Sequence, residues 1–165
     1  MDIVVCAKQV PDSTAVKFDI VAKRLQNVHY IMDPIDEVGL SEAISIREKL
    51  GGSVTAITLG PRQSQGVLRT ALQMGADRSI HVLDEAFDSL DPQRTASILA
   101  AQISRMPYDL VLCGVQSMDA ANGFVGTGIA ELLGLPLVTA VTRIDVFADS
   151  QTAVVHKRLK GRSAW

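Results

Sequence analysis

The chain has 165 residues, 47% of them hydrophobic and 21% charged, and its 16 Lys and Arg residues against 18 Asp and Glu residues give a formal net charge of −2. This length and composition predict a single globular domain, residues 1–165, and the lack of a basic excess argues against nucleic-acid binding. No apolar run reaches the roughly 20 residues of a membrane span and no basic leader opens the chain, so we expect a cytoplasmic protein without membrane insertion.

The first third of the chain predicts a strand, a hairpin and a helix. Residues 2–7 form a short continuous apolar run, which is typical of a strand buried on both faces. Residues 16–30 contain two loosely alternating pieces, interpreted as an excursion hairpin. Asp33-Pro34 then predicts the start of a helix, because Asp caps helices and Pro suits the first helical position. We expect this helix to stop at Leu50-Gly51-Gly52, because Gly is the usual residue at a helix end.

The middle of the chain repeats the pattern of a buried strand followed by a helix. Residues 53–59 and 79–83 predict the second and third strands, and Asp91-Pro92 repeats the cap-and-proline start of a helix. The helix between these two strands is expected to end before Gly75. It carries an apolar stripe that is interpreted as core, made of Val67, Leu68, Ala71 and Leu72.

The last part of the chain continues the alternation. Residues 109–113 predict a fourth strand, residues 114–123 a loop that leads into a helix, and residues 137–147 and 153–156 the final strands. Strands that read as continuous apolar runs and alternate with helices indicate a parallel sheet. The predicted fold class is therefore α/β, with a doubly wound, mostly parallel Rossmann-like sheet and helices on both faces.

The loop of residues 114–123 is the most suggestive place for a ligand. In doubly wound sheets, ligands bind at the carboxyl ends of the strands, near the point where the strand order reverses. This loop is rich in small residues, and the first turn of the helix after it is expected to include Gly123 and Gly126. Backbone N–H groups at such a helix start can bind a phosphate. The alternative is a glycine-bearing loop without a ligand, because glycine is common there.

No catalytic or metal-binding set stands out in the sequence. Cys6 and Cys113 are interpreted as small buried hydrophobes, and the three histidines lack metal-ligand spacing. Asp33, Asp36 and Glu37 can form either a carboxylate site or the capped, acidic start of a helix, and the second interpretation is favoured. Neither a Walker A motif nor Gly-x-Gly-x-x-Gly after the first strand is present. The residues alone indicate a nucleotide-binding domain without an acid–base catalyst.

Five ordered motifs of the chain resemble those of one known protein family. The most specific is residues 69–78, Arg-Thr-Ala-Leu-Gln-Met-Gly-Ala-Asp-Arg, which is close to the family's Arg-x-Ala-Leu-Ala-Met-Gly-Ala-Asp-Arg. The other matching segments are residues 4–12, 33–37, 59–61 and 113–126, the last of them continued by 130–136. Together these motifs span nearly the whole chain, and they resemble the β subunit of electron transfer flavoprotein.

The resemblance implies one half of a heterodimeric electron carrier rather than an enzyme with its own acid–base site. It implies AMP, or FAD in bifurcating relatives, in this subunit, with the redox FAD held mainly by the α subunit. The implied partners are that α subunit and acyl-CoA or other dehydrogenases as electron donors, with a quinone- or ferredoxin-linked acceptor. It also implies an adenine-nucleotide α-hydrolase-like variant of the fold.

The nucleotide contacts that the resemblance implies cluster in a few segments of the chain. Carried over by position, they are Cys6, Asp33, Pro34, Ile35, Asp36, Leu59, Gly114, Val115, Gln116, Ser117, Met118, Asp119, Ala120, Ala121, Asn122, Gly123, Phe124 and Val125. Most of them are expected to act through backbone groups and shape.

Several positions depart from the family pattern. Asp33 stands where the family usually has Asn, Val115 where Lys is common, and Phe124 where the family has a polar residue. Family chains continue past the position of Trp165, so we expect the chain to lack the family's C-terminal partner-docking segment. Two alternatives therefore stay open: a stand-alone adenine-nucleotide-binding module resembling universal stress proteins, and a truncated paralogue that binds no nucleotide.

Overall fold

The structure is a computed structural model that describes residues 1–15, 17–20, 23–26, 28–147, 149 and 152–157. Its centre is a parallel sheet of four strands, β1 (Asp2–Cys6), β6 (Ser53–Gly60), β7 (Arg78–Leu83) and β8 (Leu110–Leu112). The strand order is β7-β6-β1-β8. The chain thus moves outward from β1 to β7 and then returns to the other side of β1, which confirms the predicted doubly wound sheet.

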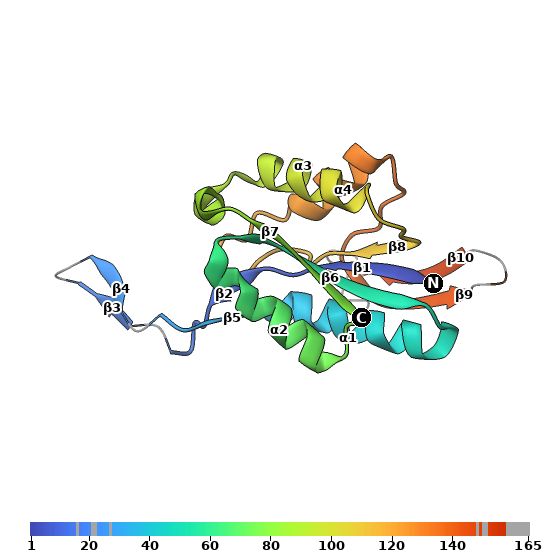
Figure 1. Cartoon of the computed structure of the whole chain (residues 1–165), viewed down its shortest axis with the longest axis horizontal. Helices are drawn as coiled ribbons and strands as arrows, with labels where there is room; N and C mark the ends of the chain where they lie inside the picture. The colour runs from blue at the N-terminus through green and yellow to red at the C-terminus, as the bar shows by residue number, and fades with distance from the viewer. Residues whose placement is uncertain (16, 21–22, 27, 148, 150–151, 158–165) are drawn as a thin grey trace, which may run out of the picture.

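Four helices cover the two faces of this sheet (Figure 1). On one face lie α1 (Pro34–Leu50) and α2 (Gln65–Met74), and on the other lie α3 (Pro92–Ile103) and α4 (Val125–Leu133). Alternate residues of β1 enter the two cores. Ile3 and Val5 pack with residues of α1 and α2, whereas Val4 and Cys6 pack with residues of α3 and α4. Because both faces of the strand are buried, its sequence is a continuous apolar run.

The predicted helix starts follow local capping chemistry. The Asp33 carboxylate accepts a hydrogen bond from the Ile35 N–H, and the Asp91 carboxylate accepts one from the Arg94 N–H. In each case Pro is the first helical residue, which confirms both predicted starts. Helix α1 ends at Leu50, and the next residue, Gly51, has a φ of 72°, which lies in the region that favours glycine.

Two details of the helices differ from the prediction. Leu72 does not belong to the core but is 45% exposed, because it lies one step around α2 from the buried Ala71. Gly123 does not belong to the first turn of α4, which begins at Val125. Gly123 instead precedes the helix with a φ of 60°, a conformation that turns the chain into α4.

The remaining strands form three antiparallel pairs outside the parallel sheet. The predicted excursion hairpin is confirmed by β3 (Lys17–Asp19) and β4 (Arg24–Gln26), although residues 16, 21–22 and 27 lie outside the described part. It projects from the body of the molecule (Figure 1). The other pairs are β2 (Gln9–Pro11) with β5 (Tyr30–Met32), and β9 (Val141–Phe147) with β10 (Thr152–Lys157).

The C-terminal strands differ from the prediction in extent, and their pairing was not predicted. Residues 137–140 are not part of β9, and β9 pairs with β10 rather than with the parallel sheet. Ile144 and Val146 of β9 pack against the core on the α1–α2 side of the sheet, which holds this pair on the body. Among the described residues, no helix combines the length and the apolar character needed to cross a membrane.

Candidate functional site

A cavity of about 390 Å³ opens at the carboxyl edge of the parallel sheet. Its walls come from the ends of β1, β6 and β8, the start of α3 and the first turn of α4. The cavity lies where the strand order reverses between β1 and β8, the place at which doubly wound proteins bind ligands. Its volume falls within the range of small-molecule sites, about 300–1,000 Å³.

Most of the predicted contact residues border this cavity, and the others belong to the same segments without lining it. Those that line it are Cys6, Asp36, Leu59, Gly114, Gln116, Ser117, Asp119, Ala120, Asn122, Gly123, Phe124 and Val125. Those that do not line it are Asp33, Pro34, Ile35, Val115, Met118 and Ala121. The structure thus brings the predicted segments to one place.

Some lining residues lie outside the set of contacts that the family resemblance implies. Lys8, Gln9 and Ser64 line the cavity from segments that follow strand ends, and the general rule for doubly wound sheets already points to such segments. A second set comes from the start of α3 and the loop before it: Phe87, Leu90, Pro92 and Thr95. No motif marks this set, although the Asp91-Pro92 helix start places it at the carboxyl edge.

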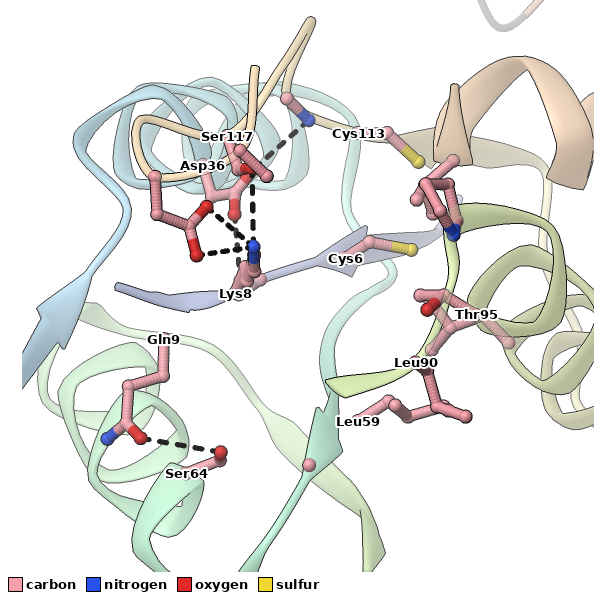
Figure 2. A pocket seen from close by; sticks show the side chains of 18 of the residues that line it. Cys6, Lys8, Gln9, Asp36, Leu59, Ser64, Leu90, Thr95, Cys113 and Ser117 are labelled. Atoms are coloured by element: carbon pink, nitrogen blue, oxygen red, sulfur yellow. Dashed lines mark hydrogen bonds and ion pairs between the residues drawn. The ribbon is translucent and has the colours of Figure 1, made fainter. Parts of the chain in front are cut away.

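The carboxylate of Asp36 links two walls of the cavity. Its Oδ2 accepts the Lys8 N–H at 2.8 Å and its Oδ1 accepts the Gly114 N–H at 3.1 Å. These bonds join the start of α1 to the chain just after β1 and just after β8 (Figure 2). Burial raises the pKa of Asp36 to about 7, although the hydrogen bond from the Lys8 backbone works in the opposite direction.

Asp33 anchors the loop of residues 114–123 from behind. The side chain is fully buried, and its Oδ1 accepts the Ile35 N–H at 2.9 Å while its Oδ2 accepts the Met118 N–H at 2.7 Å. Both carboxylate oxygens are therefore used within the protein, and the side chain does not line the cavity. The acidic cluster that begins at Asp33 is therefore the capped helix start that the sequence favoured. In addition, Asp33 holds the loop through the N–H of Met118.

Lys8 brings a positive charge to the cavity wall. Its Nζ lies 2.6 and 2.7 Å from the two carboxylate oxygens of Asp119 and 3.3 Å from the Ser117 Oγ (Figure 2). Burial raises the pKa of Asp119, but its hydrogen bonds with Lys8 and Ser117 outweigh burial and leave it below the ordinary value. Among the described residues, Lys8 is the only Lys or Arg that lines the cavity.

The start of α4 forms the part of the wall best suited to an anion. Phe124 precedes the helix and provides no side-chain cap, unlike the aspartates before α1 and α3. The first N–H groups of a helix have no partner within it, and the positive end of the helix dipole lies there. Since Gly123, Val125 and Gly126 line the cavity, a phosphate in it can accept hydrogen bonds from this turn.

Both cysteines border the same space. Cys6 is buried as predicted, whereas Cys113 is only partly buried, because the cavity opens beside it. Gly126 of α4 packs closely over Cys113, so that a Cβ placed at Gly126 would lie 3.1 Å from the Cβ of Cys113. Within the described ranges, no group of three or more His, Cys, Asp or Glu side chains is arranged to hold a metal ion.

Comparison with known proteins shows which family the chain resembles. The electron transfer flavoprotein domain model matches residues 24–164. The chain is 44% identical to electron transfer flavoprotein subunit beta of Thermoanaerobacterium thermosaccharolyticum, over 90% of this chain and 58% of the relative. It is 40% identical to the subunit of the same name from Clostridium acetobutylicum, over 100% of this chain and 61% of the relative.

A third relative extends the comparison to a larger complex. The caffeyl-CoA reductase-Etf complex subunit CarD of Acetobacterium woodii is 38% identical, over 97% of this chain and 62% of the relative. The chain spans about three fifths of the length of these relatives. The match over residues 24–164 confirms the resemblance seen in the motifs, and the chain belongs to the electron transfer flavoprotein domain family.

Proposed function

We propose that the chain acts in the cytoplasm as the β subunit of an electron transfer flavoprotein and binds AMP in the cavity at the carboxyl edge. Nucleotide binding is supported by the uncapped start of α4, which borders the cavity where the strand order reverses. The subunit part is supported by the family match and by the names of the relatives.

The chemistry of the cavity wall fits an adenine nucleotide. The turn around Gly123 and Gly126 would hold the phosphate through backbone N–H groups, and Lys8 would supply a nearby positive charge. Leu59 and Leu90 offer apolar surface for the base. The volume of about 390 Å³ lies near the lower end of small-molecule sites, which favours a mononucleotide over a dinucleotide.

The side chains at the cavity serve to position a ligand. The carboxylates of Asp36 and Asp119 are both engaged, one by backbone N–H groups and the other by Lys8. In the proposed heterodimer, FAD held mainly by the α subunit supplies the redox chemistry. Electrons would come from a dehydrogenase, and the name of the CarD relative places that protein in a complex with a reductase.

Copurification tests the proposed role. We expect the chain, coexpressed with an FAD-bearing α subunit, to purify as a one-to-one complex with flavin absorbance and to release AMP on denaturation. A homodimer that binds AMP or ATP but does not bind the α subunit would instead show that the chain is a stand-alone nucleotide-binding module. A chain that binds neither the α subunit nor AMP, ADP, ATP or FAD would contradict the proposal and favour the non-binding paralogue.

A further inference from the structure

The two cysteines of the chain lie next to each other on neighbouring strands. Strands β1 and β8 are parallel and in register, with Val5 opposite Leu112, and one further step along both strands brings Cys6 beside Cys113. Cys6 belongs to the core on the α3–α4 side, and Cys113 packs against that same core. The two side chains therefore leave the sheet on the same side, and both border the cavity (Figure 2).

The spacing of the two residues suits a covalent bond. Neighbouring strands of a sheet lie about 4.7–4.9 Å apart, which is within the separation of about 4.4–6.8 Å between Cα atoms that a disulfide spans. Both thiols are free. The neighbouring Cys113 thiol is the largest cause that raises the pKa of Cys6, and burial is the next, as expected for two thiols on adjacent strands.

We propose that Cys6 and Cys113 form a reversible disulfide when the protein meets a peroxide, which makes this corner of the cavity an oxidant-sensitive modification site. The more exposed Cys113 reacts first: its sulfur takes one oxygen atom from the peroxide to become a sulfenic acid, and one water is released. The Cys6 sulfur then attacks the Cys113 sulfur. The displaced hydroxide leaves with the Cys6 proton as a second water.

The step balances without any other reactant. Two thiols and one hydrogen peroxide give one disulfide and two waters, and a small dithiol reverses the change by thiol–disulfide exchange. Because the first turn of α4 packs on Cys113 through Gly126, closure of the bond alters the wall of the cavity at that turn. Formation of the bond requires neither a bound nucleotide nor a partner subunit, so it goes beyond the proposed function.

Intact mass and peptide mapping of the peroxide-treated chain test this proposal. The sequence contains two cysteines, so a disulfide within one chain has to join Cys6 to Cys113. The reduced, folded chain is exposed to a small excess of hydrogen peroxide and then alkylated. We expect the monomer to lose two hydrogen atoms, both thiols to escape alkylation, a linked peptide pair to appear, and dithiothreitol to restore both thiols.

The single variants serve as controls for the natural chain. We expect C6S to accumulate oxygen adducts on Cys113 and C113S to keep its thiol, neither of them forming a bond within the chain. The proposal is overturned if the natural chain keeps both thiols or gains oxygen on each cysteine separately. It is equally overturned if the bond joins separate chains only, or forms only in denaturant, where the fold no longer holds the two strands together.

Discussion

At the scale of single residues, Asp36 combines burial with a contact to two loops. It is 7% exposed, and its oxygens accept N–H groups of Lys8 and Gly114, which begin two of the cavity walls. The sequence predicted Asp36 as an acidic residue in the first helical turn and, through the family resemblance, as a nucleotide contact. Its two partners follow other strands, and no local pattern encodes that arrangement.

The raised pKa of Asp36 predicts a dependence of stability on pH. Since folding raises the pKa from 3.8 to about 7, the folded state binds this proton more tightly, and the added stability is lost as the pH rises through about 7. We expect the free energy of unfolding, relative to D36N, to fall by up to about 4 kcal/mol between about pH 4 and pH 7, at about 1.4 kcal/mol per unit. Urea unfolding across this range measures the difference, and parallel profiles would contradict it.

At the scale of elements, the two Asp-Pro helix starts share a sequence pattern but not a role. The Asp91 carboxylate accepts the N–H of Arg94, which belongs to the first turn of the same helix. Asp33 caps α1 in a similar way and also accepts the N–H of Met118, which is 85 positions away. The capping was predictable because it depends on neighbours in sequence, whereas the anchor depends on how α1 packs beside the loop after β8.

This difference predicts that two matched substitutions lower the free energy of unfolding by unequal amounts. We expect D91A to lower the free energy of unfolding by about 1 kcal/mol, the usual effect of losing a helix cap. D33A should lower it by about 1–3 kcal/mol more, because the partly buried hydrogen bond from the Met118 N–H to the buried Asp33 carboxylate is lost as well. Urea unfolding of the two variants gives both values, and equal losses would show that the Asp33 anchor contributes nothing.

At the scale of the whole molecule, continuous apolar runs predicted the parallel sheet, and the order of strands and helices predicted its two covered faces. The antiparallel pairing of β9 with β10 was not predicted, since a strand pattern does not specify its partner. The wall formed by Phe87, Leu90 and Thr95 was missed for a related reason. Their sequence carries no ligand motif, and they border the cavity because the β7–α3 connection returns to the carboxyl edge.

Calorimetric titration with AMP tests most directly whether this cavity binds the nucleotide. Thr95 of α3 lines the cavity, and T95W fills it, whereas the exposed Ser97 of the same helix lies outside it and S97W serves as the matched control. We predict that the natural chain and S97W bind one AMP per chain with equal affinity. T95W should bind at least about tenfold more weakly, a loss of about 1.4 kcal/mol, with an unchanged urea midpoint. Tight AMP binding by T95W, or no AMP binding by the natural chain, would contradict the proposed site.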